Sequence, residues 1–86
     1  MPRISLFYGI AIYMYYRDHS PPHVHAIYGE HEAIIEIGTG AILEGSLPRR
    51  ALSMACDWVA MHRKELDANW QFARAGQPLN QIAPLD

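Results

Sequence analysis

The segment HVHAIYGEHEAIIEI, residues 23–37, carries the pattern that decides the fold. Apolar and polar side chains largely alternate in each half of the segment, which is the period of a half-buried β-strand. The dipeptide at residues 29–30 begins with glycine, and a glycine at the first central position is typical of a two-residue hairpin turn. The segment therefore predicts an antiparallel hairpin in which His23 pairs with Glu36.

This register sorts the side chains of the hairpin onto two faces, because successive residues of a strand point to opposite sides. The apolar face, which we expect to pack on a helix, consists of Val24, Ala26, Tyr28, Ala33, Ile35 and Ile37. The other face carries His23, His25, Glu32 and Glu36, and the preceding extended segment adds Tyr13, Tyr15 and Arg17. The sequence thus predicts a dense group of polar and aromatic side chains on the sheet face away from the helix.

The residues on both sides of the hairpin are also extended. Residues 3–8 and 10–16 are rich in β-branched and aromatic side chains, and Gly9 separates them at a bend or tight hairpin. A further short run, residues 41–44, follows a glycine-containing turn. The pattern predicts an antiparallel sheet of four to five short strands within residues 3–45.

From Pro48 onward the hydrophobic period changes from two to about 3.6 residues. The apolar positions then recur at spacings of three, four or seven, at Leu52, Ala55, Cys56, Val59, Leu66, Trp70 and Ala73. Proline suits a first helical turn and Gly76 suits a helix end. We therefore predict an α+β fold, one domain over residues 1–86, with the sheet backed by one long helix over about 48–75 and an extended tail. Leu52, Cys56 and Val59 are expected to be buried against the sheet.

A straight helix of that length would be about 42 Å long, whereas a six-residue strand covers about 20 Å. The second half of such a helix would leave Trp70 without a sheet to pack on, and exposed apolar surface of this kind usually marks an interface. The sequence therefore predicts a homodimer, or a complex with another protein, formed through this half of the helix and the tail.

Composition narrows the classes of protein to consider. The chain has 86 residues, half of them hydrophobic, and a formal net charge of −2, which argues against a general nucleic-acid coat. It has no apolar run long enough to span a membrane and no signal-like start, and its single cysteine, Cys56, cannot form an internal disulfide. We expect a cytoplasmic protein that does not bind membranes.

Three interpretations of the histidine-rich face follow from the residues. The first is a metal site, because His23 and His25 lie about 6.5–7 Å apart on one strand face and such a pair can chelate zinc or a similar ion. Glu36, opposite His23, is the expected third ligand, and Asp18 or His19 is expected to arrive from the preceding loop.

The second interpretation needs no metal and is a surface that cleaves or binds RNA. A carboxylate beside a histidine suits acid–base catalysis, so the candidate catalytic residues are His23, His25, Glu36 and Arg17, the last gripping a phosphate. Tyr13, Tyr15 and Tyr28 are candidate binding residues, since tyrosines stack on bases. The third interpretation is structural, with Asp18 capping the loop and His23 paired with Glu36 across the strands.

Arg49 and Arg50 are a second clue, because positive charge in the first turn of a helix opposes the helix dipole. A salt bridge to Glu44 or Glu36 would relieve this effect. A bound phosphate or the acidic face of a partner is the alternative.

The chain also resembles a known family. The resemblance rests on the run from Ile4 through Tyr13, Met14 and Tyr15, and above all on the signature Asp18-His19-x-Pro21-Pro22-His23-x-His25-Ala26-x-Tyr28-Gly29. It extends through Leu43-Glu44-Gly45-x-Leu47-Pro48-x-Arg50-Ala51 to Asn69-Trp70-x-x-Ala73-x-x-Gly76-x-Pro78-Leu79. In these motifs the sequence is similar to the small bacterial family of unknown function designated DUF 4160.

That family has no established activity, so the resemblance implies no catalytic residues and does not choose between an enzyme and a binding protein. Its genes commonly lie beside another small family, designated DUF 2442, in an arrangement similar to toxin–antitoxin operons. The resemblance therefore implies a partner-binding module of a two-gene system, acting on RNA or translation, with the neighbouring gene product as its partner. A metal-binding or metal-dependent hydrolytic protein is the alternative.

Overall fold

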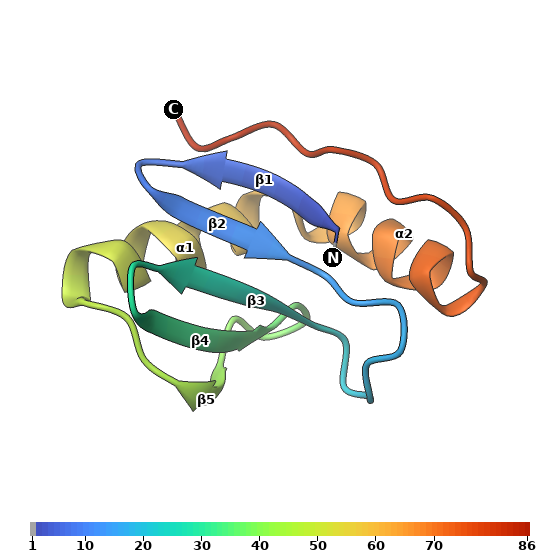
Figure 1. The fold of residues 1–86 in the computed structure, drawn as a ribbon, viewed down its shortest axis with the longest axis horizontal. Coiled ribbons are helices and arrows are strands. Elements are labelled where there is room, and N and C mark those ends of the chain that lie inside the picture. Colours follow the sequence, from blue (N-terminus) through green and yellow to red (C-terminus); the bar gives the residue numbers. More distant parts are fainter. Residues whose placement is uncertain (1) are drawn as a thin grey trace.

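The computed structural model describes residues 2–86, which form an antiparallel sheet of five strands and two helices (Figure 1). The strands lie side by side in chain order and are β1 (Arg3–Phe7), β2 (Ile10–Tyr13), β3 (His23–Tyr28), β4 (His31–Glu36) and β5 (Ile42–Gly45). The helices are α1 (Arg49–Met61) and α2 (Arg63–Arg74). The predicted α+β class and the antiparallel sheet are confirmed.

The central hairpin has the predicted register. Tyr28 pairs with His31 and His23 pairs with Glu36, and Gly29 has the positive φ of 59° that this turn requires. Tyr13 of β2 pairs with His25 of β3, so the tyrosines join the histidines on one face. The alternation of side chains therefore places the polar face as the sequence predicts.

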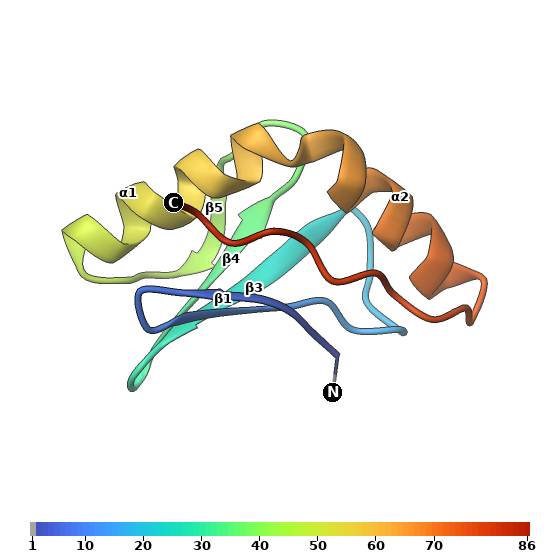
Figure 2. The same cartoon turned by 90° about the horizontal axis from the view of Figure 1, so that it is seen from above.

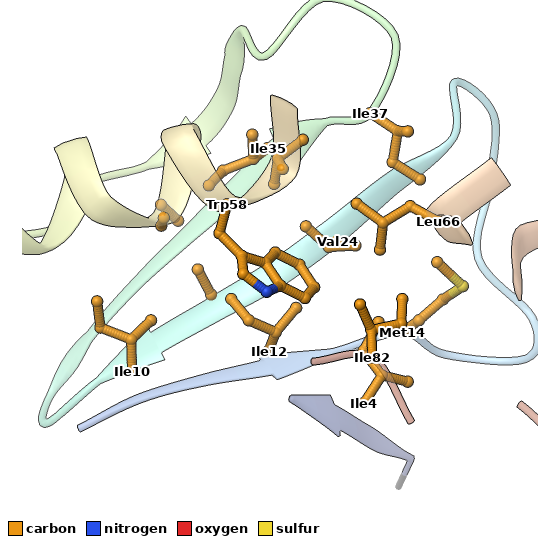
Figure 3. Close-up of a cluster of buried hydrophobic side chains, with 14 of the residues drawn as sticks. Ile4, Ile10, Ile12, Met14, Val24, Ile35, Ile37, Trp58, Leu66 and Ile82 are labelled. Carbon is orange, nitrogen blue, oxygen red and sulfur yellow. The ribbon is translucent and has the colours of Figure 1, made fainter. Parts of the chain in front are cut away.

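The hydrophobic core lies between the sheet and the two helices. Figure 3 shows the indole of Trp58 at the middle of the cluster, close to Ile12 and Val24. Val59 is fully buried as expected, but Leu52 and Cys56 are only half-buried at the margin of the core. The expected apolar stripe is thus displaced by part of a turn, because the large indole of Trp58 occupies the centre.

The prediction of one long helix is wrong, because the helix breaks at His62. The backbone of His62 (φ −113°, ψ 25°) is not helical, and its ring contacts Glu65 at 2.6 Å on the following turn. Arg63 donates a hydrogen bond from Nε to the carbonyl oxygen of Ile37 at 2.8 Å, which ties the break to the end of the sheet. A straight helix over residues 49–74 would be about 39 Å long, more than the 34 Å of the molecule's longest dimension.

The break removes the reason to expect an overhanging helix. Figure 2 shows α2 turning away from the line of α1 and running down past the end of the sheet. Trp70 is only 3% exposed, and it is buried within its own chain, as are Leu66 and Ala73. The expectation that Trp70 lacks a surface to pack on is therefore wrong.

The tail after Gly76 is extended and lies along β1 (Figures 1 and 2). Ile82 donates its backbone N–H to the carbonyl oxygen of Ile4 at 2.8 Å, and its side chain is buried in the core. Trp58 donates its indole N–H to the carbonyl oxygen of Ala83 at 2.8 Å. The tail thus covers one edge of the sheet.

Neither helix among residues 2–86 is long and apolar enough to span a membrane.

Candidate functional site

Three side chains from the start of β3 and the loop before it converge on one point. The carboxylate oxygen Oδ2 of Asp18 lies 3.1 Å from Nε2 of His23 and 3.0 Å from Nε2 of His25. One potential ligand atom from each residue lies within 4.8 Å of the others. Among residues 2–86, this is the one group of three or more histidine, cysteine or acidic residues with such spacing.

The other ring nitrogen of each imidazole, Nδ1, contacts a hydrogen-bond acceptor. Nδ1 of His23 lies 2.7 Å from the carbonyl oxygen of Pro21, and Nδ1 of His25 lies 2.8 Å from a carboxylate oxygen of Glu32. A carbonyl oxygen only accepts hydrogen bonds, so Nδ1 of His23 carries a proton and donates it to Pro21. His25 lies between two carboxylates and donates to Glu32 from Nδ1 when its Nδ1 carries the proton. This pattern is the one that metal-binding histidines usually show, with the second ring nitrogen donating to a carbonyl or a carboxylate.

Donation from Nδ1 determines whether Nε2 has a free lone pair. In a neutral imidazole protonated at Nδ1, Nε2 bears a lone pair. The lone pairs of His23 and His25 then both face the negatively charged carboxylate of Asp18, which is repulsive without a positive charge between them. A positive charge held between the three atoms, such as a shared metal ion, would remove this repulsion.

Aromatic rings surround the two histidines. The indole of Trp70, from α2, packs on His23 with ring centroids 5.3 Å apart, and His23 is only 8% exposed. Tyr15 contacts His25 edge to face at 4.5 Å, and Tyr13 stacks on Tyr15 at 6.3 Å. The rings limit the orientations open to both imidazoles.

Two side chains, those of Tyr15 and Cys56, have raised pKa values. Burial raises the pKa of Tyr15, and the negative charge of Glu32 raises it further, so its hydroxyl stays protonated at neutral pH. Burial likewise raises the pKa of the Cys56 thiol, with a smaller contribution from Asp57. Cys56 is therefore a thiol rather than a reactive thiolate at neutral pH.

The structure gathers some of the expected site residues and separates others. Asp18 reaches the two histidines from the loop, whereas Glu36 accepts a hydrogen bond from Thr39 and is not part of the group. His19 lines a pocket beside the group, and the exposed Arg17 makes no side-chain hydrogen bond or ion pair with other described residues.

The remaining candidates lie elsewhere. Tyr28 is exposed at the far end of β3, and the start of α1, with Arg49 and Arg50, lies at the end of the molecule opposite the loop that carries Asp18 (Figure 1). Neither arginine forms an ion pair within residues 2–86, so the expected salt bridge to Glu44 or Glu36 is absent from the part of the chain described.

Three contributors to the site were not singled out from the sequence. Glu32 was placed on the correct face by the alternation of side chains, but its bond to His25 is diagonal across the hairpin and depends on rotamers. The contact of Trp70 with His23 depends on the break between the helices. Glu44 lines the pocket with the histidines because Ile34 pairs with both His25 and Glu44, a register between β4 and β5 that the sequence does not predict.

Two imidazole nitrogens and one carboxylate oxygen are ligand types that zinc takes in proteins, and catalytic zinc sites commonly have three protein ligands. The fold and the site together define a small α+β protein with a two-histidine, one-carboxylate donor set at the end of its sheet.

Comparison with known families assigns the chain more narrowly. Residues 9–71 match the family model described as domain of unknown function DUF4160, and the protein belongs to this family. The matched segment contains Asp18 and both histidines of the donor set. Comparison with curated proteins and with solved structures gives no match.

Proposed function

We propose that this protein binds one divalent metal ion of the zinc class through Asp18, His23 and His25. The observation that carries the proposal is the direction of the imidazoles: each is held at Nδ1 by an acceptor, so each directs Nε2 at the same carboxylate oxygen. A metal ion between these atoms would take two Nε2 lone pairs and one carboxylate oxygen as its ligands.

Metal binding is tested by thermal unfolding and by the visible spectrum of the cobalt form. We expect one molar equivalent of zinc to bind, and an excess of about 100 times Kd to add roughly 2.7 kcal/mol to the free energy of unfolding. For a domain of this size such a gain raises Tm by at least about 10 °C. Cobalt should give the absorption of a four- or five-coordinate ion.

The variants Asp18→Asn and His25→Gln should lose most of this effect, because each removes one ligand with little change of volume. His31→Gln is the matched control, since His31 is an exposed histidine at the start of β4. A Tm that does not respond to zinc, cobalt or nickel, or responds equally in Asp18→Asn, would exclude the site.

A second candidate function, binding of a partner protein, is favoured by the unequal edges of the sheet. The tail covers the edge at β1, whereas no strand among residues 2–86 pairs with the outer edge of β5. Every residue of β5 is exposed, including Ile42 at 38% and Leu43 at 43%. An open edge with apolar side chains is a template for strand addition.

We propose that β5 receives an extended segment of the partner encoded by the neighbouring gene, in the two-gene system that the family resemblance implies. Glu32 and Glu44 lie close to this edge, so the segment should be basic as well as apolar. Binding of the purified DUF 2442-like gene product is the measurement. Leu43→Asp should weaken it by more than about tenfold, or 1.4 kcal/mol.

Leu6→Asp is the control for this experiment, because Leu6 is similarly exposed, at 48%, on the strand whose edge is covered. If Leu6→Asp weakens binding as much as Leu43→Asp does, the partner does not sit on β5.

A further inference from the structure

The surface beside the donor set is hollowed into a pocket of about 270 Å³. The loop at residues 18–21 forms one wall, Leu43 and Glu44 of β5 form the other, and the two histidines lie with Ile34 between the walls. The pocket is open to solvent on one side, so a small molecule can reach the point where the three ligand atoms meet.

Glu44 lines the pocket on the side opposite Asp18. Ile34 pairs with His25 on one side and with Glu44 on the other, so all three side chains point to the same face. His25 and Glu44 are two strand spacings apart, or about 10 Å between backbones, and their long side chains both reach into the pocket between them. Within residues 2–86, the carboxylate of Glu44 makes no hydrogen bond or ion pair that would occupy it.

We propose that the zinc-loaded protein hydrolyses small neutral esters or amides, with Glu44 as the general base. This inference rests on the proposed metal site. Three protein ligands leave a coordination position for water, and zinc lowers the pKa of that water to about 7. A carboxylate across the pocket is the group needed to take its proton.

The reaction is balanced without another reactant. Glu44 takes a proton from the zinc-bound water, and the resulting hydroxide forms a bond to the carbonyl carbon of the substrate. The tetrahedral intermediate collapses, the bond from carbon to the leaving oxygen or nitrogen breaks, and Glu44 returns the proton to the leaving group. The products are a carboxylic acid and an alcohol or amine.

The charge of the pocket selects the class of substrate. No lysine or arginine is among the described residues that line it. The two positive charges of a zinc ion face three carboxylates, those of Asp18, Glu32 and Glu44, which leaves a net charge of −1. A phosphate ester would be repelled, whereas a neutral carbonyl group would not. The small volume and the apolar side chains of Pro21, Ile34 and Leu43 favour a short acyl group.

The full chain loaded with one equivalent of zinc should hydrolyse p-nitrophenyl acetate at least about 100-fold faster than the zinc-free protein. Glu44→Gln should lower kcat/KM of the loaded protein by about 100-fold or more, with its Kd for zinc unchanged. Glu30→Gln, at the exposed hairpin turn, is the matched control and should retain full activity.

Each result separates this inference from the proposed metal site. If zinc binds but the loaded protein is no faster than the zinc-free protein, or Glu44→Gln is fully active, the hydrolytic inference is overturned and the metal site stands. Preferential cleavage of bis(p-nitrophenyl) phosphate would overturn the class of substrate. Failure to bind zinc would overturn both.

Discussion

The backbone conformation of Gly45 affects the position of Glu32, a hydrogen-bond partner of His25. Its φ of 76° is in the left-handed region, and the next residue, Ser46, donates its N–H to the carbonyl oxygen of Glu32 at 3.0 Å. A Cβ atom on Gly45 would collide with that same carbonyl oxygen. Because the side chain of Glu32 holds His25, the backbone at Gly45 supports a hydrogen-bond partner of the candidate ligand.

We predict that Gly45→Ala destabilises the fold far more than Gly40→Ala does. Both glycines have a φ of 76°, so each substitution incurs the cost of a left-handed residue, about 1–2 kcal/mol. Only at Gly45 does the new methyl group meet backbone, which adds about 1–3 kcal/mol. Urea unfolding of the two variants measures the difference, and equal midpoints would show that β5 moves freely away from β4.

Among the single residues of the site, the sequence predicts the two histidines on the strand and names Asp18 and His19 as alternatives in the loop. The pairing of His23 and His25 on one face follows from the two-residue period of the strand. The approach of Asp18 depends on the path of the loop at residues 17–22, which no periodicity encodes. The sequence predicts Glu36 as the third ligand because it pairs with His23, but pairing of backbones does not fix the direction of a side chain.

At the scale of elements, a single buried side chain joins α2 to the tail. Asn69 is 1% exposed, and its side-chain amide donates to the carbonyl oxygen of Asn80 at 2.9 Å and accepts from the N–H of Asn80 at 3.0 Å. Two residues further on, Ile82 enters the core and bonds to β1. Asn69 therefore positions the segment that covers the sheet edge.

We predict that Asn69→Ala lowers the free energy of unfolding by about 1–3 kcal/mol and releases the tail, because both backbone groups of Asn80 lose their partner. Hydrogen exchange at the amide of Ile82 should become faster. Asn80→Ala is the matched control, since both bonds use its backbone and survive the substitution. Unchanged exchange in Asn69→Ala would mean that packing of Ile82 alone holds the tail.

The helical elements show why the sequence predicts a type of structure better than its extent. The period near 3.6 continues from α1 into α2, so nothing in the pattern distinguishes one helix from two. The break at His62 contains neither proline nor glycine and is held by tertiary contacts, chiefly that of Arg63 with Ile37. The end of α2 was predictable, because Gly76 adopts a φ of 72° and its N–H bonds to the carbonyl oxygen of Ala73.

At the scale of the whole molecule, the bend between the helices makes the chain as compact as an isolated domain should be. The radius of gyration is 11.6 Å, and a compact domain of this length should have about 12 Å. The class of fold and the central register follow from alternation and turn chemistry. The prediction of an interface at Trp70 followed from treating the helix as straight. Association through the open edge at β5 stays a proposal.

The bond between Ile4 and Ile82 has a consequence for the order in which the molecule assembles. The five strands are joined to their neighbours in sequence, so the sheet can form while a nascent chain is still emerging from the ribosome. Its first strand, however, is completed by a segment synthesised after both helices, and Gln81 bonds to Arg3 across a separation of 78 residues. Until that segment emerges, both edges of the sheet are unpaired. The nascent chain can then aggregate through β1 as well as through β5.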